Sequence, residues 1–451
     1  MKKSRMRLMA IVSMASSLML TIAACGPGAS TASQTKLGDV SKDVASAGKV
    51  TLVVWDQNTD GGMPQAQKEL NAEFQKKYPN VTIKRNSQSF SDLKTTLKLA
   101  LSSNNPPDVV QANQGYPDMG AFIQAGMIRP VDDYAKLYDW SSYYPSKLLK
   151  LNSFSKDGKT WQGKSLYGIS QTGELVGVYY NKTLMNQLGL KPPTTITELQ
   201  SEMAVAKKAG IQPLSFGDLD KYPGIHLFGF VQSAMAGSTY VNDLVKGSSG
   251  SWTSSATVKA ATTIQNWVEK GYITQDANGV SADSAASDFT SGKALFNVNG
   301  TWQQQTYAAA MGNTNVGFVT MDTKDGKPSA MGGEGLAWAI TSKSKHPDVA
   351  AAYIDFVNTS HAAQVLLKTG NLPSVLPSSY EPEKSTLAAS IATQYRKVQK
   401  ADGVVPYLDY TTSTFYDTLT AGMQNLIARQ STPTEFTGEL QKDYASFLDK
   451  Q

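Results

Sequence analysis

The sequence contains one cysteine, Cys25, and three histidines, and these scarcities exclude two kinds of site. A single thiol has no disulfide partner within the chain, so each domain must be held together by an ordinary hydrophobic core. The histidines, His226, His346 and His361, do not supply with one cysteine the nitrogen and sulfur ligands of a usual zinc site. We therefore expect no metal site and no cofactor.

Strong net charge is also lacking. The chain carries 42 Lys and Arg against 37 Asp and Glu, which gives a net charge of +5. Four of the cations and no anion lie in residues 1–24, so the remaining 427 residues have a net charge of only +1. A nearly neutral chain lacks the basic surface that binds nucleic acid, and we expect no nucleic-acid partner.

The N-terminal segment has the order of a secretory signal peptide, in which cations precede an apolar run and small residues. The apolar run, Leu8–Leu20, is shorter than the roughly 20 residues that span a bilayer. It leads into Thr21-Ile-Ala-Ala-Cys25-Gly26, which resembles the lipobox of bacterial lipoproteins. The resemblance implies a lipoprotein signal peptide at 1–24, lipid such as palmitate on Cys25, and an anchor on the extracellular face of the cell membrane. The alternative is an ordinary cleavage site that happens to include a cysteine.

The residues after the signal predict a flexible tether followed by an α/β unit. Residues 25–48 are rich in Ser, Ala, Gly and Lys and have no apolar period. The chain beyond them is long enough for two domains, because single cores stop growing near about 250–300 residues. The apolar periods predict a β-α-β-α-β unit and hence a parallel sheet with right-handed crossovers. Its expected elements are strands at 50–55, 81–85 and 108–112, a helix at 63–78, and a helix capped by Ser91 with Leu93, Leu97 and Leu101 on its apolar face.

A second α/β block is expected to start near Trp161. Thr195-Ile-Thr-Glu198 has the pattern of a capping box and opens a helix that runs to about Lys208. The other expected elements are strands at 175–180 and 211–216 and helices at 182–188, 256–270 and 283–291. The pattern therefore predicts two α/β lobes.

Two motif matches lack the structural context that their chemistry needs. Gly158-Lys-Thr-Trp-Gln-Gly-Lys-Ser165 matches the phosphate-binding loop, but polar residues precede it and a strand-like segment follows it in place of a helix. We interpret it as a glycine-rich hairpin. Asp56-x-Asn58-x-Asp60-Gly61 copies the start of an EF-hand, but Gln67 stands where such a loop requires a bidentate Glu, so no calcium is expected.

Seven segments, taken in order, carry a resemblance to a known family. The most diagnostic group is Tyr179-Tyr-Asn-Lys182 followed by Gly189 and Pro193-Thr194. Phe289-Thr-Ser-Gly-Lys-Ala294 leading to Gly300-Thr-Trp302 is nearly as specific. The others are Val50–Trp55, Phe74–Val81, Pro107–Val110, Gly126–Asp132 and Leu166–Ile169. Together they resemble the extracellular solute-binding proteins of carbohydrate ABC importers, the family that includes maltose-binding protein.

The resemblance implies an α/β fold of the two-lobed, periplasmic-binding-protein-like type II, with a ligand cleft between the lobes. Each lobe would be a mainly parallel sheet flanked by helices. The implied boundaries put 49–160 and 322–375 in lobe one and 161–321 and 376–451 in lobe two, and Asn181 resembles the hinge asparagine that fixes backbone. The implied function is a monomeric, lipid-anchored substrate-binding component that closes on an oligosaccharide and delivers it to the permease subunits of an ABC importer.

Candidate ligand residues in lobe one follow three successive strands. Oligosaccharides present apolar ring faces and rims of hydroxyl groups, so their sites combine aromatic side chains with carboxylates and amides. Ligands of open α/β sheets bind beyond the carboxyl ends of strands. The candidates there are Asn58, Asp60, Phe90, Asn113, Gln114 and Tyr116, beside Asp56, Gln57, Gln88 and Gln111. A turn or a helix cap is an equal alternative for each of them.

The lobe-two candidates are Trp302, Gly333, Glu334, Tyr407 and Asp409. Trp302 stands where relatives commonly place a stacking aromatic residue. Gly332-Gly-Glu-Gly335 resembles the family's glycine-rich segment that faces the cleft, although a plain turn is the alternative. Tyr407 and Asp409 form an aromatic and acidic cluster with Tyr410. Tyr222 and His226 offer further aromatic surface, whereas Phe228, Trp267 and Phe356 are expected in the core.

Other classes of function have weaker support in the sequence. An exported glycoside hydrolase needs two opposed carboxylates, and no pattern pairs any two here. An adhesin would show β repeats or low-complexity stalks, which are absent from the sequence. Within the binding class, the alternative ligand is another polar solute, such as a polyol or glycerol phosphate. A phosphate ligand needs clustered arginines, and the strand-end loops contain none. We therefore expect a binding protein with no catalytic residues.

Overall fold

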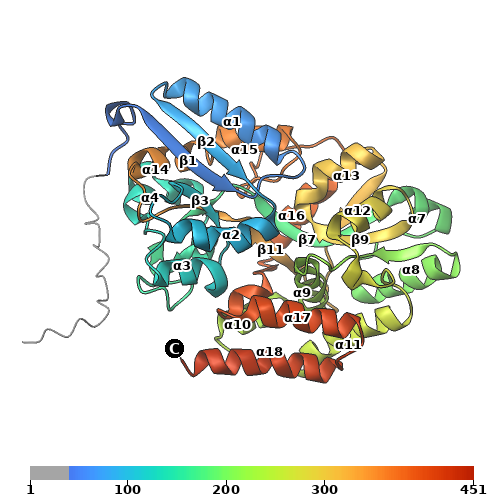
Figure 1. The fold of residues 1–451 in the computed structure, drawn as a ribbon. Helices are drawn as coiled ribbons and strands as arrows, with labels where there is room; N and C mark the ends of the chain where they lie inside the picture. Colours follow the sequence, from blue (N-terminus) through green and yellow to red (C-terminus); the bar gives the residue numbers. More distant parts are fainter. Residues whose placement is uncertain (1–39, 451) are drawn as a thin grey trace, which may run out of the picture. The chain divides into compact units, whose positions relative to one another are not determined.

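The computed structural model describes residues 40–450. The expected signal peptide, the expected lipid attachment site Cys25 and most of the expected tether lie outside the described residues. Residues 40–450 belong to one compact unit that is built on two large β-sheets with helices around them (Figure 1). Within this part of the chain, no helix is both long enough and apolar enough to cross a membrane.

The first sheet has five strands in the order β2-β1-β3-β12-β6. Its strands are β1 (Val50–Asp56), β2 (Val81–Ser87), β3 (Val109–Ala112), β6 (Ile169–Ser170) and β12 (Ala337–Ile340). β1 runs parallel to both β2 and β3, with helices α1 (Met63–Lys77) and α2 (Phe90–Ser102) as the connections. The predicted β-α-β-α-β unit is therefore confirmed.

The two connecting helices bury the predicted apolar stripes, which are Ala66, Leu70 and Phe74 in α1 and Leu93, Leu97 and Leu101 in α2. The predicted cap of α2 is wrong, because the chain is already helical at Phe90. Ser89 is the cap, and its hydroxyl oxygen accepts a 3.1 Å hydrogen bond from the amide of Asp92. Ser91 instead lies in the first turn of the helix.

The second sheet is organised around β7 (Gly173–Asn181), which β9 borders on one side and β10 and β11 border on the other. The order is β13-β11-β7-β9-β8, with β10 paired to β7 outside this path. These strands are β8 (Gln212–Ser215), β9 (Ala294–Gly300), β10 (Val316–Val319), β11 (Ala330–Glu334) and β13 (Val404–Val405). All three neighbours of β7 are antiparallel to it, and only the β8–β9 and β11–β13 pairs are parallel.

The expectation that both sheets are mainly parallel is wrong. Two extended segments pass between the sheets, since β6 continues into β7 and β11 continues into β12. The two segments run in opposite directions, with β11 antiparallel to β7 and β12 antiparallel to β6, so each sheet receives antiparallel partners. The α/β class itself is confirmed. The implied lobe boundaries at 160, 321 and 375 stay a prediction. β6 follows the implied boundary at 160 but belongs to the first sheet, and β11 follows the implied boundary at 321 but belongs to the second sheet.

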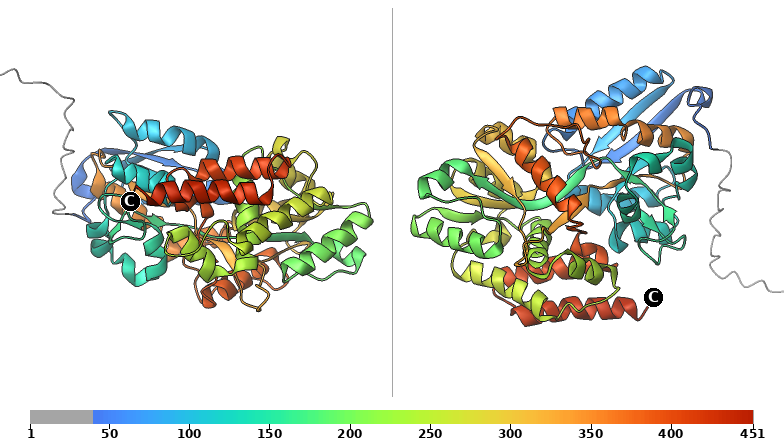
Figure 2. Two further views of the ribbon diagram at one scale, coloured as in Figure 1. Left: turned by 90° about the horizontal axis from the view of Figure 1, so that it is seen from below. Right: turned by 180° about the vertical axis from the view of Figure 1, so that it is seen from behind.

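Helices cover both sheets, and a cluster of helices that includes α9, α11, α17 and α18 packs together. The remaining helices are α3 (Ala121–Gln124), α4 (Asp132–Tyr138), α5 (Trp140–Tyr143), α6 (Ser146–Leu151), α7 (Lys182–Leu188), α8 (Ile196–Lys208), α9 (Tyr222–Ala236), α10 (Ser238–Lys246), α11 (Ser255–Glu269), α12 (Ala282–Thr290), α13 (Gln304–Met311), α14 (Pro347–Phe356), α15 (Ser360–Lys368), α16 (Leu387–Lys400), α17 (Phe415–Ile427) and α18 (Pro433–Leu448). Short helical turns lie at η1 (Ala45–Ala47), η2 (Tyr116–Gly120), η3 (Ala277–Gly279), η4 (Thr301–Gln303) and η5 (Leu408–Thr411). Figure 2 shows α17 and α18 side by side, and α9 and α11 pack against this pair.

The expected elements of the second block are present, with one difference in a helix cap. The side chain of Thr195 caps α8 as predicted, because it accepts the amide of Glu198 at 3.2 Å. The Glu198 carboxylate, however, accepts the amide of Thr194 at 2.7 Å instead of the amide of Thr195. Phe228 and Trp267 are fully buried, as expected of core residues.

The two rejected motifs have other structures. Residues 158–165 lie in a hairpin, because β4 (Ser153–Phe154) pairs antiparallel with β5 (Ser165–Leu166), and β6 follows in place of a helix. The Asp56 carboxylate is bound by Arg85, with Nε 2.6 Å from Oδ2 and Nη2 2.7 Å from Oδ1. Among residues 40–450, no group of three or more His, Cys, Asp or Glu residues could hold a metal ion.

Candidate ligand cleft

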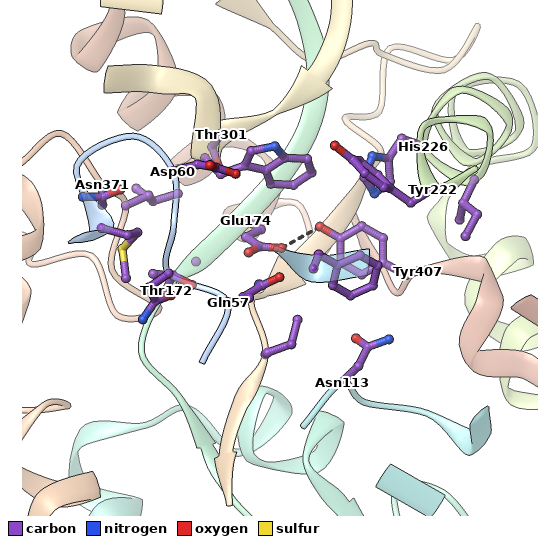
Figure 3. A pocket seen from close by; sticks show the side chains of 18 of the residues that line it. Gln57, Asp60, Asn113, Thr172, Glu174, Tyr222, His226, Thr301, Asn371 and Tyr407 are labelled. Carbon is purple, nitrogen blue, oxygen red and sulfur yellow. Dashed lines mark hydrogen bonds between the residues drawn. The ribbon is translucent and has the colours of Figure 1, made fainter. Parts of the chain in front are cut away.

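A cavity with about 1060 Å³ of space free of protein atoms, its open mouth included, lies beyond the carboxyl ends of β1 and β3 and beside the start of β7. Segments associated with both sheets line it (Figure 3). The lining residues are Gln57, Asn58, Asp60, Met63, Phe90, Asn113, Thr172, Gly173, Glu174, Tyr222, Ile225, His226, Thr301, Trp302, Leu336, Asn371, Leu372, Tyr407, Asp409, Tyr410 and Tyr416. A large concave site that combines aromatic side chains with carboxyl, amide and hydroxyl groups is typical of ligand binding.

The loop after β1 forms one wall and is fixed from behind by a buried ion pair. Asp56, held by Arg85, accepts the amide of Asn58 at 2.9 Å. The side chain of Gln111 accepts the amide of Gln57 at 2.8 Å and donates to Asn58 Oδ1 at 3.3 Å. The ion pair and the amide network therefore hold the backbone of this loop at the cavity.

Aromatic side chains form the opposite wall. Trp302 lies in η4, directly after β9, and its ring centroid is 5.1 Å from that of His226. The His226 ring is in turn 5.5 Å from Tyr407 and 5.4 Å from Tyr222. A Cβ atom at Gly300 would lie 1.8 Å from Cζ3 of Trp302, so only glycine lets the indole fold back over the strand end. This close contact is the physical reason for the Gly300-Thr-Trp302 pattern.

Glu174 lies between these walls and carries a carboxyl group into the cavity. The Tyr407 hydroxyl donates a 2.7 Å hydrogen bond to Glu174 Oε2 (Figure 3). Burial raises the pKa of Glu174 to about 7 even though this hydrogen bond acts to lower the pKa. Burial also raises the pKa of Asp409 to about 6 and lowers the pKa of His226 to about 3, so His226 is neutral at physiological pH.

Seven of the eleven candidate residues line the cavity, and their ligand contacts stay a prediction. These are Asn58, Asp60, Phe90, Asn113, Trp302, Tyr407 and Asp409. The structure does not bring Gln114, Tyr116, Gly333 and Glu334 to it.

Each of those four residues has a structural partner instead. Gln114 Nε2 donates to Asn152, Ser170 and the carbonyl of Gly335, and Gln114 Oε1 accepts the Tyr410 hydroxyl at 3.0 Å, so the hydrogen-bonding capacity of this side chain is used outside the cavity lining. The Tyr116 hydroxyl accepts the amide of Trp161 at 3.1 Å. Glu334 accepts a 2.9 Å hydrogen bond from Asn152, and a Cβ at Gly333 would point at Val404 and Leu151.

The architecture and the cavity agree with what known proteins show. The pattern of the bacterial extracellular solute-binding proteins matches residues 57–364. This chain belongs to that family. The multiple sugar-binding protein of Streptococcus mutans is 24% identical over 353 residues, which cover 75% of this chain and 78% of that protein.

Solved structures share the fold. A chitin oligosaccharide binding protein superimposes with a TM-score of 0.75 at 20% identity, over 88% of this chain and 98% of that chain. The structure of RafE in complex with raffinose superimposes with a TM-score of 0.68 at 19% identity, over 88% of this chain and 100% of that chain. The two-lobed, solute-binding fold class is therefore confirmed.

The sequence-based selection of cleft residues in this solute-binding protein missed several. Glu174, Thr172, Thr301 and Asn371 line the cavity and were not among the candidates. One signal was present for Glu174, which is the single acidic residue beside the apolar run that begins at Leu175. Thr172 and Asn371 lie in connecting segments that approach the cavity only in the folded chain.

Proposed function

We propose that this chain is the substrate-binding component of a carbohydrate ABC importer, which captures an oligosaccharide between its lobes and delivers it to the membrane permease. The observation that carries the proposal is one cavity in which an aromatic wall, with Trp302 and Tyr407, faces carboxylate and amide groups such as Glu174 and Asn113. Aromatic rings stack on the apolar faces of sugars, and the polar groups bind their hydroxyls. The sugar-binding names of the Streptococcus mutans relative and the structural neighbours support the same class of ligand.

Closure of the lobes follows from where these groups originate. Asp60 and Asn113 follow strands of the first sheet, whereas Glu174 and Trp302 belong to β7 and to the turn after β9 in the second sheet. A ligand that contacts both groups binds the closed form more tightly than the open form and shifts the equilibrium by that difference.

The anchoring of the protein is a second part of the proposal. We propose that Cys25 receives lipid and that the segment after it tethers a monomeric binding protein to the outer face of the cell membrane. The lipobox-like sequence before Cys25 and the extracellular family support this assignment. The permease subunits of the importer would then meet the closed protein at the membrane.

A binding screen tests the function directly. Calorimetric titration and thermal melting with raffinose, maltotriose, xylotriose and triacetylchitotriose should find at least one saturable ligand. A ligand present at 100 times its Kd adds about 2.7 kcal/mol to the free energy of unfolding, so the rise in Tm is readily measured. The absence of binding to every member of a broader panel of neutral oligosaccharides would contradict the proposal.

A further inference from the structure

The side chains that line the cleft and can carry charge near neutral pH are all acidic. Asp60, Glu174 and Asp409 are its carboxyl groups, and none of the described lining residues is Lys or Arg. His226 is the one basic side chain among them, and burial lowers its pKa to about 3. A ligand in this cavity therefore meets carboxylates without any cation to balance them.

Two cations that contact lining residues, Arg85 and Lys94, are already paired with carboxylates. Arg85 binds Asp56 at 2.6 Å behind the loop after β1. Lys94 of α2 binds Asp118 at 2.6 Å and lies 4.2 Å from the centroid of the Tyr416 ring. Neither lines the cavity. Moving either cation to an anionic ligand would leave a partly buried carboxylate without its partner, which is costly.

Glu174 is the carboxyl group whose geometry is best suited to select a ligand. It lies on β7 next to the crossing between the sheets, and its Oε2 accepts the Tyr407 hydroxyl at 2.7 Å. Within residues 40–450, no hydrogen bond is made to Oε1, and Figure 3 shows the carboxyl group among the side chains of the cavity. A sugar hydroxyl can donate to this oxygen, whereas a carboxylate or phosphate offers no proton and adds a like charge.

We propose that Glu174 restricts this cleft to uncharged oligosaccharides and rejects sugars that carry a carboxylate or a phosphate. The inference rests on the proposed function and adds the substrate class that the cavity admits. A like charge placed against a buried carboxylate costs several factors of ten in affinity. We therefore expect a neutral oligosaccharide to bind at least about 100-fold more tightly than its carboxylated analogue.

The discrimination should depend on pH, because burial raises the pKa of Glu174 to about 7. At pH 8 the group is mostly ionised and repels an anionic sugar, whereas at pH 5.5 it is mostly protonated and the repulsion weakens. Around it, burial raises the pKa values of Tyr395, Tyr407 and Tyr410, which stay protonated, and raises the pKa of Glu334 on the paired strand β11 well above its usual value. The other titratable groups that line the cavity are His226, which stays neutral, and Asp409 and Asp60. Burial also raises the pKa of Asp409 to about 6, so Asp409 adds to the same trend.

The test compares matched ligands by calorimetric titration at pH 8 and pH 5.5. The probes are raffinose and maltotriose, each beside the derivative in which a terminal C6 alcohol is oxidised to a carboxylate. Wild-type protein should show the 100-fold preference at pH 8 and a preference at least fivefold smaller at pH 5.5. Glu174→Gln should lose most of the preference at pH 8, measured as the ratio of the two Kd values, whatever affinity for the neutral sugar is lost with the carboxylate.

Glu202→Gln is the matched control. Burial raises the pKa of Glu202 on α8 to about 7 as well, but Glu202 does not line the cavity. This variant should keep the preference and its pH dependence, so a general change in protein charge is separated from an effect in the cleft.

The outcomes separate the two proposals. Equal binding of neutral and carboxylated sugars by the wild type, or an unchanged preference in folded Glu174→Gln, would overturn the role of Glu174 and leave sugar binding intact. If Glu174→Gln does not fold, the wild-type pH series decides, because a preference that is constant from pH 5.5 to pH 8 also overturns the inference. Failure to bind any neutral oligosaccharide would contradict the proposed function itself.

Discussion

The ring of Phe90 meets the ring of Tyr222 edge to face, with their centroids 5.9 Å apart and their planes at 81°. Phe90 begins α2, which connects strands of the first sheet, and Tyr222 begins α9, which packs against strands of the second. Both rings line the cavity. The pair therefore joins segments of the two sheets at the cavity, and the proposed closure on a ligand predicts that an open form lacks this contact.

A double-mutant cycle tests this contact. Phe90→Ala, Tyr222→Ala and the double variant should each bind the oligosaccharide identified in the screen more weakly than wild type. An aromatic pair contributes about 0.5–1.5 kcal/mol beyond its buried area, which corresponds to a coupling of about 2- to 10-fold in Kd. Tyr222→Phe keeps the ring and should retain the coupling. Strictly additive losses would show that the rings act separately.

Trp302 should contribute to binding, and Trp267 should contribute to stability. Trp302 lines the cavity, whereas Trp267 is fully buried on α11. Trp302→Ala removes a stacking platform worth about 1–3 kcal/mol, so affinity should fall roughly tenfold to a hundredfold while Tm changes little. Trp267→Ala creates a core cavity and should cost about 3–5 kcal/mol of stability. Sugar affinity and Tm are measured together on both variants. A collapsed Tm with unchanged affinity in Trp302→Ala would place that side chain in the structural core instead.

The sequence predicted the elements and several cleft residues because those depend on local patterns. The nearly continuous apolar run in 50–55, the Thr195 cap of α8, and the position of Asn113 just past a strand are all visible in a short window of sequence. The Gly300-Thr-Trp302 pattern has a local cause as well, since the indole needs the space over Gly300. Short sequence patterns were therefore enough to predict the parallel strands of the first sheet and Trp302 in the aromatic wall of the cavity.

The remaining features depend on the folded chain. Asn113 and Gln114 are equally polar neighbours, and both lie within hydrogen-bond distance of the Tyr410 hydroxyl. Only Asn113 lines the cavity, whereas the Gln114 amide donates to Asn152 and Ser170, which are distant in sequence. Glu174 reaches the cavity because β6–β7 crosses between sheets, and that crossing also introduces the antiparallel pairs. A pattern of apolar residues can predict that a segment forms a strand, but it does not predict which sheet that strand joins.

The phosphate-loop match should have no nucleotide function. Lys164 is exposed and precedes β5 of a hairpin, where no helix N-terminus is available to bind phosphate. Lys164→Ala should leave sugar affinity within twofold of wild type, and ATP should shift the Tm of neither protein. The neutral oligosaccharide serves as the positive control in the same melting experiment. A rise in Tm that requires both ATP and Lys164 would contradict this interpretation.

Lipid attachment at Cys25 can be checked in cells. Cys25→Ser removes the thiol that the proposal assigns to the lipid, so the protein should be released into the medium or remain as an uncleaved precursor. Fractionation and the mass of the mature N-terminus distinguish these products, and Ser30→Ala in the same segment serves as a control that keeps the cysteine. An unchanged membrane-bound fraction of Cys25→Ser would show that the anchor lies elsewhere.

A buried carboxyl group outside the cleft should make stability depend on pH. Asp218 is fully buried, its Oδ1 accepts the amide of Gly224 at 2.6 Å, and its Oδ2 has no hydrogen-bond partner among the described residues. Burial raises the pKa of Asp218 from 3.8 to about 8. The folded state therefore holds the proton more tightly than the unfolded state. The cost of ionising Asp218 is absent below pH 4 and grows as the pH rises toward 8.

Asp218→Asn keeps the acceptor for Gly224 and removes the ionisation. Its stability should match that of wild type near pH 4 and exceed it by an amount that increases up to pH 8, on the order of a few kcal/mol. Denaturant unfolding of both proteins at each pH gives this difference directly, and the other titrating groups cancel because they are common to both. A difference that is constant with pH, or largest in acid, would mean that Asp218 is already ionised in the folded protein.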